Sequence, residues 1–303
     1  MPAKRSASSV RMASDILRDM PFPLQCVHCR RHPDNLPHGH PFYELVLVTG
    51  GTGVHVVEER EYPLAAGDVF LLYGGMTHHY IRTRELTLFN ILFDPARLQL
   101  PLSELRQMPG YHMLFWLEPR LRGTDRSCGR LQLRMRSLAQ ATAIVGRLRE
   151  ELDGTPDGYR FMACNALMEL LGFLCRSCTE SRQPALRPLL PLGAVLAHIE
   201  QHFGEPISIR QLCDVAHMSE SSLTRFFRMA VGFAPIEYVI RVRAGHAAAR
   251  LRTTDDRITD VALACGFSDG NYFSRQFRRL HGKSPRAYRQ AHRAISGESG
   301  IHS

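Results

Sequence analysis

The last hundred residues of the chain contain one short pattern twice, 50 positions apart. The first copy comprises Arg225, Phe227, Arg228, Gly232, Pro235 and Tyr238, and the second comprises Arg275, Phe277, Arg278, Gly282, Pro285 and Tyr288. A repeat of this size indicates that one supersecondary unit is used twice. The residues in and around each copy predict a helix, a tight turn, a second helix and a Gly-Pro exit, which is the order of a helix-turn-helix.

The second copy carries the clearer turn signals. Apolar residues at helical spacing predict a helix over 258–265, and Gly266 ends it, because glycine adopts the left-handed conformation at little cost. Ser268 is expected to cap the next helix by accepting a hydrogen bond from a free backbone N–H. Phe273 and Phe277 fall on one face of that helix, so we expect them to be buried.

The first copy repeats this logic with one irregularity. An apolar helix ends near Ala216, Ser219 is the expected cap, and Phe227 is expected in the core. The cap and the phenylalanine are eight residues apart here (227 − 219) but nine in the second copy (277 − 268). His217 also stands where the second copy has Gly266. We therefore expect the two copies to present their second helices differently.

A polar and cationic face accompanies both predicted second helices. Its members, at positions i, i+4 and i+7, are Ser221, Arg225 and Arg228 in the first copy and Asn271, Arg275 and Arg278 in the second. Such stripes are usually only solvated surface, but this one occurs twice within the same turn chemistry. It suits a helix in the major groove of DNA. A long helix predicted over 235–252 would hold both faces on successive major grooves, about 34 Å apart.

Composition supports a nucleic-acid partner. The chain has 303 residues, a formal net charge of +9 and a sequence pI near 9.4, and cationic charge attracts a protein to phosphate. No apolar run approaches the roughly 20 residues that span a bilayer, and no secretory signal is visible, so we expect a cytoplasmic protein without a membrane partner. No nucleophile–base motif or phosphate-cradling loop is present, and we expect no enzymatic activity.

The second copy resembles the signature of the AraC/XylS transcriptional regulators. The matching segments are 262–268, 272–275, 277–279, Gly282, 284–285 and 288–289, within a resemblance that covers about 192–291. It implies that each second helix enters a major groove. Carried over by position, it implies base reading by Ser221, Thr224, Arg225, Asn271 and Arg275, and phosphate contacts by Arg228, Arg278, Arg279 and Lys283.

Short strand-like runs with glycine-rich turns dominate the N-terminal half. We expect strands over 43–48, 54–57, 69–73 and 86–93, separated by turns that include 50–53, 67–68 and 74–75. Many short strands with such turns predict a β-sandwich or a small barrel.

Histidines and a glutamate in this half resemble the two cupin motifs. The spacing H-x-H-x3-E is followed by a later histidine, and the four residues are His38, His40, Glu44 and His78. In metal-binding cupins such side chains hold a divalent metal. Tyr73 stands at the usual proline position, however, and Arg82 stands where an asparagine is usual. We therefore expect no metal and no cofactor. If a metal binds, these four residues are its candidate ligands; otherwise they line an effector pocket or satisfy hydrogen bonds inside the barrel.

The segments 42–46, 51–56 and 88–93 are similar to the rhamnose-responsive branch of the AraC family. The resemblance implies a cupin-like barrel as the sensor, a small sugar or other polar metabolite as the effector, and a role as activator of a utilisation operon. The candidate effector-pocket residues are His38, His40, Tyr43, Glu44, His55 and His78. The runner-up hypothesis is a metal-dependent cupin enzyme, an oxygenase or isomerase, fused to a DNA-binding domain.

Two helices are predicted between these halves, over about 131–152 and 161–174. The second is so apolar that most of its sides must be buried, against the barrel or against a partner subunit. The resemblance favours a homodimer. Two CxxC pairs, which begin at Cys26 and Cys175, have the spacing of zinc ligands, but nothing in the sequence brings the pairs together. We expect reduced thiols.

The predicted fold class is α+β in two domains: a cupin-like β-barrel with a helical pair, and an all-α tandem helix-turn-helix. The predicted parts are a flexible tail (1–20), the effector-binding domain (21–128), a helical dimerisation or packing region (129–180), a stiff linker (181–191), the DNA-binding domain (192–293) and a second tail (294–303). The predicted function is an effector-responsive regulator that binds double-stranded DNA and, by family resemblance, RNA polymerase.

Overall fold

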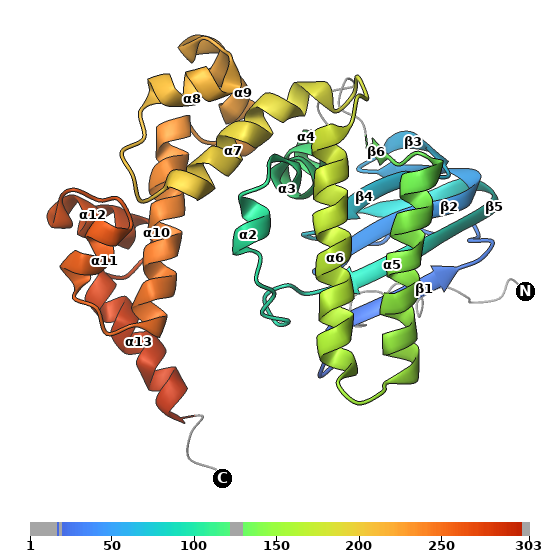
Figure 1. Ribbon diagram of the computed structural model, residues 1–303, viewed down its shortest axis with the longest axis horizontal. Coiled ribbons are helices and arrows are strands. Elements are labelled where there is room, and N and C mark those ends of the chain that lie inside the picture. The colour runs from blue at the N-terminus through green and yellow to red at the C-terminus, as the bar shows by residue number, and fades with distance from the viewer. Residues whose placement is uncertain (1–16, 18–19, 122–129, 299–303) are drawn as a thin grey trace, which may run out of the picture. The chain divides into compact units, whose positions relative to one another are not determined.

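The computed structural model describes residue 17, residues 20–121 and residues 130–298, with side chains up to residue 292. The chain forms two compact units, residues 1–193 and 194–303. The first unit combines a β-sheet with helices, and the described part of the second is helical (Figure 1). The predicted α+β class is therefore confirmed.

The sheet of the first unit is antiparallel throughout. Its strands are β1 (Leu24–Cys29), β2 (Tyr43–Val57), β3 (Arg60–Ala65), β4 (Asp68–Leu72), β5 (His78–Phe93) and β6 (Leu131–Gln132). They lie in the order β1-β5-β2-β4-β6, and β3 pairs with the second half of β2. One face of the sheet packs an apolar core around Val46, Phe70, Leu72 and Tyr80.

Residues 50–53, which we predicted as a turn, lie inside β2. The register between β2 and β5 shifts several times between Val48 and Val54, which is the mark of β-bulges. Gly51 has a φ of 70°, and a Cβ atom there would lie 2.1 Å from the carbonyl oxygen of Glu85. The glycines therefore permit close approach of two long, bent strands and do not reverse the chain. The predicted turns at 67–68 and 74–75 have the expected positive φ at Gly67, Gly74 and Gly75.

Helices pack against the other face of the sheet (Figure 1). They are α2 (Ser103–Arg106), α3 (Pro109–His112), the π-helical η1 (Met113–Leu117), α4 (Glu118–Leu121), α5 (Met135–Gly154) and α6 (Tyr159–Glu180). Of these, α5, α4 and η1 contact the strands of the sheet, and α2 and α3 pack against α6. α5 and α6 form a helical hairpin, and α5 contacts β1. The two predicted mid-chain helices are thus confirmed.

α6 buries only part of its apolar surface. Leu167, Leu171 and Leu174 are buried, whereas Phe161 is 69% exposed and Met162 is 48% exposed. Among the described helices, α6 alone is long and apolar enough to cross a membrane, a criterion that buried core helices of soluble proteins also meet. The expectation that most of its sides are buried therefore holds for its C-terminal half and not for its first turn.

The second unit is built around α10 (Pro235–Thr253), the long helix predicted from the sequence. The other helices are α7 (Leu190–His202), which begins in the first unit, α8 (Ile209–Ala216), α9 (Glu220–Val231), α11 (Ile258–Ala264), α12 (Gly270–His281) and α13 (Pro285–Glu298). The 19 residues of α10 correspond to a rod of about 28 Å. Phe273 and Phe277 of α12 pack into one core with Ala247 and Leu251 of α10.

The caps of the second helices differ from the prediction in one copy. Ser219 caps α9, because its side chain accepts a hydrogen bond from the backbone N–H of Ser222. Ser268 does not cap α12; Asp269 does, by accepting from the backbone N–H of Tyr272. The cap-to-phenylalanine distance is therefore eight residues in both copies, and the extra residue of the second copy lies in its turn. The two helices thus share one register relative to their caps, and the expectation that the copies present them differently now rests on the different turns alone.

The predicted tails and linker fall partly on described residues. Leu17, in the predicted N-terminal tail, is buried against Phe42 and Leu92, whereas residues 1–16 and 18–19 lie outside the described part. Residues 122–129 and 299–303 also lie outside it. The predicted linker 181–191 contains the 3-10 helix η2 (Arg187–Leu189) and the first turn of α7.

Candidate DNA-binding faces and effector site

The exposed face of α9 carries the residues that we expected to contact DNA. Leu223 and Phe227 are fully buried on the inner side of the helix. The outer side forms a shallow groove, and the described residues that line it are Glu220, Ser221, Thr224, Arg225 and Arg228. The burial of the inner side therefore fixes which side of α9 is available to a partner.

The exposed face of α12 has the same layout, because both helices begin after a capping residue and are twelve residues long. Asn271, Arg275, Arg278 and Arg279 are exposed, and Lys283 is exposed just beyond the helix. Position by position, Asn271 corresponds to Ser221 of α9 and Arg275 to Arg225. The two faces thus present matching positions with partly different chemistry.

The arginines on the two faces differ from several other arginines of this unit. Among the described residues, no carboxylate pairs with the faces' cations Arg225, Arg228, Arg275, Arg278 and Arg279. Other arginines that the composition counted as DNA-attracting charge are occupied within the unit. Arg243 donates to the carbonyl oxygens of Phe203 and Glu205, and Arg250 pairs with Asp256 at 2.8 Å. The arginines of the two faces are therefore available to a partner, whereas Arg243 and Arg250 are not.

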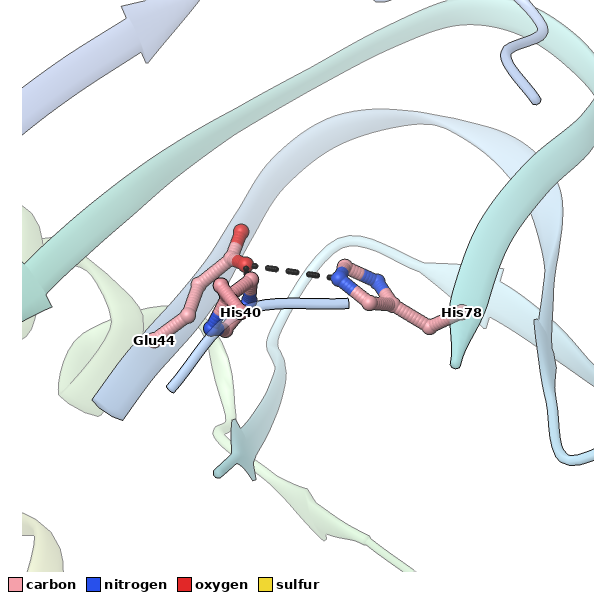
Figure 2. Close-up of side chains that lie close together, drawn as sticks. All are labelled: His40, Glu44 and His78. Atoms are coloured by element: carbon pink, nitrogen blue, oxygen red, sulfur yellow. Dashed lines mark hydrogen bonds and ion pairs between the residues drawn. The ribbon is translucent and has the colours of Figure 1, made fainter. Parts of the chain in front are cut away.

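In the first unit, the histidines predicted from the cupin-like spacing come together (Figure 2). Nε2 of His40 lies 2.7 Å from Oε2 of Glu44, and Nε2 of His78 lies 3.6 Å from the same oxygen. All three residues are at most 4% exposed. His38 is held beside His78 by two backbone hydrogen bonds, with the imidazole centres 4.3 Å apart. His55 completes the group, with its Nε2 3.2 Å from Nδ1 of His78.

Glu44 is a buried carboxyl group with the imidazoles of His40 and His78 beside it. Burial alone would raise its pKa, but the hydrogen bond with His40 and the nearby imidazoles of His78 and His38 outweigh that effect and lower the pKa of Glu44. Its hydrogen-bonding and ion-pairing partners among the described residues are His40 and His78. Buried charges normally require a paired group or a metal, and the imidazoles of His40 and His78 are the paired groups here.

Arg130 reaches the same cluster, and we did not predict it. Its Nη2 lies 2.7 Å from Nδ1 of His55, and its guanidinium lies over the rings of Tyr62 and Phe70, at 4.7 Å and 4.2 Å from their centres. Arg130 and His55 are 75 residues apart in the chain. No local motif surrounds Arg130, so no signal in the sequence points to this contact.

Tyr43, which we expected in the effector pocket, lies apart from the histidines. It precedes Glu44 in β2, and successive side chains of a strand point to opposite faces. Its ring stacks on those of Tyr73 and Phe93, with centres 5.5 Å and 5.6 Å away. Burial raises the pKa of Tyr43. The cluster therefore unites five of the six predicted pocket residues.

A cavity of about 250 Å³ opens near this cluster. Its walls include Tyr62 from β3, Tyr73 and Met76 from the turn between β4 and β5, and Arg120 from α4. Tyr62 also lies beneath Arg130, which connects the cavity to the histidines. Aromatic walls with a few polar groups are typical of sites for small ligands.

The two CxxC pairs do not form a zinc site among the described residues. Cys175 and Cys178 are buried in α6, and Cys26 and Cys29 lie in β1. The cluster of possible metal ligands in the described part of the chain is His40, Glu44 and His78. The cysteines that the structure describes are free thiols.

Both units match known protein families. Residues 22–171 match the AraC-like ligand binding domain, and residues 212–291 match a helix-turn-helix domain. The HTH-type transcriptional activator RhaR of Yersinia pestis is 32% identical over 86% of this chain and 87% of its own length. RhaR of Klebsiella pneumoniae is 32% identical over 88% of this chain and 92% of its own length.

Solved structures match the second unit. The DNA-binding domain of AdpA, a global transcriptional factor in complex with a target DNA, is 37% identical, covers 35% of this chain and 95% of that chain, and has a TM-score of 0.34. An AraC-type regulator from Chromobacterium violaceum is 29% identical, covers 35% and 93%, and has a TM-score of 0.33. Since relatives at 32% identity match most of both chains, this protein belongs to the AraC family of DNA-binding transcriptional regulators.

Proposed function

We propose that this protein activates transcription from a promoter when a small polar metabolite, first of all a sugar, binds its N-terminal unit. The observation that carries the proposal is the pair of matching helix faces, α9 and α12, whose arginines have no carboxylate partner among the described residues. Unpaired cations on a helix face favour phosphate and guanine as partners. The RhaR relatives, which are named activators, support the direction of regulation.

Each face would contribute base contacts and phosphate contacts. The proposed base-reading residues are Ser221, Thr224, Arg225, Asn271 and Arg275, and the proposed phosphate contacts are Arg228, Arg278, Arg279 and Lys283. Arginine grips guanine through two parallel hydrogen bonds, and asparagine does the same with adenine. With α10 as a rod between them, the two helices would read neighbouring turns of one duplex.

Selection of binding sites from random duplex DNA, followed by footprinting, tests this geometry. We expect protection of two adjacent major-groove segments on one side of the duplex. A footprint confined to one short half-site, with no loss of affinity when Arg225 is changed to alanine, would contradict simultaneous docking.

The proposed effector site is the cavity beside Tyr62 together with the histidine cluster. Sugars need directional polar groups within apolar and aromatic walls, and Tyr73, Arg120 and the buried histidines supply both. A ligand against Tyr62 would touch the ring on which Arg130 rests, so binding would be transmitted to His55.

A calorimetric titration with rhamnose, followed by other monosaccharides, tests the effector site. Tyr73→Phe removes one hydroxyl from the cavity wall and should weaken sugar binding by roughly 3- to 10-fold, the value of one hydrogen bond. Tyr159→Phe, in α6 and outside the cavity, is the matched control and should bind normally. Equal affinity in wild type and Tyr73→Phe would place the sugar elsewhere.

We also propose that the protein is a homodimer joined through α6. Phe161 and Met162 are exposed apolar residues on one turn of that helix, and a second copy would cover them. Light scattering should give a dimer for wild type and a monomer for Phe161→Glu. Leu263→Glu, which changes an equally apolar residue that is 62% exposed in the DNA-binding unit, should remain dimeric.

Contact with RNA polymerase and a cytoplasmic location complete the proposal, on the strength of the family resemblance. Transcription with purified polymerase, operator DNA and effector as the only other components should rise when this protein is added. Unchanged transcript levels despite full operator occupancy would argue against direct contact with polymerase.

One observation, the buried His40–Glu44–His78 cluster, favours the alternative of a metal-dependent cupin enzyme. We propose that the protein is not an enzyme, because its relatives are regulators. Mass spectrometry of the effector after incubation with protein supplied with divalent metal should recover it unchanged. Stoichiometric or catalytic conversion would support the enzyme instead.

A further inference from the structure

Three buried side chains of the first unit offer metal-ligand atoms to one point. The ligand atoms of His40, Glu44 and His78 all lie within 4.8 Å of one another. They come from the segment before β2, from β2 and from β5, so the fold itself brings them together (Figure 2). Two imidazoles and a carboxylate are the donor set that divalent transition metals take in proteins.

The hydrogen bonds of the histidines orient the correct atoms toward that point. Nδ1 of His40 lies 3.0 Å from the carbonyl oxygen of Phe42, and Nδ1 of His38 lies 3.0 Å from that of Leu36. A carbonyl oxygen only accepts, so both Nδ1 atoms carry protons, and in the neutral ring of His38 Nε2 keeps its lone pair. Nε2 of His40 donates to the carboxylate of Glu44 at 2.7 Å, so a metal ion at this point would take the place of that proton. Metal-bound histidines are held in this way, with the second nitrogen donating to a carbonyl or carboxylate.

His78 is set differently, because Arg130 acts on it through His55. A guanidinium can only donate, so Nδ1 of His55 accepts from Arg130 and its Nε2 carries the proton. That proton is donated to Nδ1 of His78 at 3.2 Å. A neutral His78 therefore carries its own proton on Nε2, the atom that faces Glu44.

A metal ion on Nε2 of His78 requires the opposite arrangement. The proton of His78 must then sit on Nδ1 and be donated to Nε2 of His55, which moves the proton of His55 to its Nδ1. That atom would face the N–H of Arg130, and two donors cannot share a hydrogen bond. The metal and the Arg130–His55 hydrogen bond are thus mutually exclusive.

Displacement of Arg130 would be felt beyond the cluster. Arg130 directly precedes β6, where the backbone of Gln132 exchanges two hydrogen bonds with the side chain of Gln183. Gln183 lies in the segment that leads to α7. Arg130 also covers Tyr62 at the wall of the cavity. One arginine therefore connects the cluster, the cavity and the segment before α7.

We propose that His40, Glu44 and His78 bind a divalent transition-metal ion. Binding of the ion breaks the hydrogen bond between Arg130 and His55 and releases the arginine. The ion acts in regulation, as a ligand that favours one arrangement of the first unit over the other. The proposal goes beyond the sugar response and does not depend on it.

Titration of the full-length, chelator-treated protein with Co²⁺, followed by visible absorption, tests the site, and elemental analysis after Zn²⁺ loading gives its stoichiometry. Wild type should bind about one equivalent per chain. His40→Ala and Glu44→Gln should lose the Co²⁺ spectrum. His79→Ala, in the neighbouring residue of β5 and outside the cluster, should keep it.

Arg130→Met tests the competition and cannot be imitated by misfolding, because it predicts a gain. It should bind Co²⁺ about tenfold tighter than wild type or more, the size of effect usual for groups that hold a ligand's tautomer. Unchanged affinity would overturn the competition. Wild type that binds its operator and responds to effector, yet takes up no more Co²⁺ than His40→Ala, would overturn the metal site and leave the proposed function intact.

Discussion

The carboxylate of Asp269 accepts a hydrogen bond from the backbone N–H of Tyr272, at the start of α12. This bond satisfies one of the donors that the first turn of a helix leaves unpaired. Ser268, its neighbour, is the cap that we expected from the sequence, yet Asp269 is the residue that caps the helix. Because Asp269 and not Ser268 is the cap, α12 has the same spacing from its cap to its buried phenylalanine as α9.

Asp269→Ala should lower the free energy of unfolding by about 0.5–2 kcal/mol, the usual value of an N-cap. Ser268→Ala is the matched control and should change it by less than about 0.5 kcal/mol, as exposed substitutions usually do. Denaturant unfolding followed by circular dichroism makes the comparison. A larger loss for Ser268→Ala would reverse the assignment of the cap.

Replacement of glycine by alanine should cost different amounts of folding stability at two positions with positive φ, Gly266 and Gly282. At Gly266 (φ 81°) a Cβ atom would lie 2.5 Å from the carbonyl oxygen of Phe203 and 2.8 Å from Nε of Arg243, whereas at Gly282 (φ 73°) nothing lies within 4 Å. Gly282→Ala should therefore cost only the left-handed strain, about 1–2 kcal/mol. Gly266→Ala should cost about 3 kcal/mol or more, because it also disturbs the Arg243–Phe203 hydrogen bond. Thermal melting of the two variants should separate them clearly; equal melting temperatures would contradict the close packing.

The roles of two cations on and beside α12 can be separated by DNA binding. Arg275→Ala should weaken binding to the operator by about 1–3 kcal/mol and relax one base position. Lys283→Ala should weaken binding to all duplexes evenly and reduce the salt dependence. Fluorescence anisotropy with operator and random DNA distinguishes them, with Arg31→Ala in the first unit as control. An equal loss on all DNA from Arg275→Ala would remove its base-reading role.

Buried thiols should be inert in the folded protein. Burial raises the pKa of Cys26 and Cys175 to about 12, so at pH 8 the thiolate is a minute fraction of each. Alkylation by iodoacetamide should therefore reach the less buried Cys164 and Cys213 first, and the rate at Cys26 and Cys175 should rise about tenfold per pH unit while the fold persists. Peptide mass spectrometry gives the order. Rapid labelling of Cys175 at neutral pH would show that α6 opens.

Local patterns predicted much of the second unit. The helix over 235–252, the turns at His217 and Gly266, and the buried phenylalanines follow from spacing and turn residues alone, because helix periodicity and backbone conformation depend on near neighbours. The same is true of the cation faces. Whether an arginine is free to contact DNA was not predictable, because some arginines are held by hydrogen bonds to distant parts of the chain. Arg243, for example, donates to the carbonyl oxygen of Phe203, 40 residues away.

In the first unit, the sequence identified the histidines and the glutamate by spacing, and the structure brings five of the six predicted pocket residues together. It did not identify the continuity of β2 through Gly50–Gly53, because a glycine run permits both a turn and a bulge, and only pairing with β5 decides between them.

The sequence by itself determined the repeated helical unit, the AraC-type character of the chain and the residue types of the cluster, since these rest on short-range order. Only the tertiary structure decided that Arg130 enters the cluster, that Tyr43 faces away from it, and that Asp269 begins α12. The reason is physical. The hydrogen bond between Arg130 and His55 joins residues that are 75 positions apart in the chain. The conformational preferences of neighbouring residues do not specify which distant donor will pair with a buried acceptor.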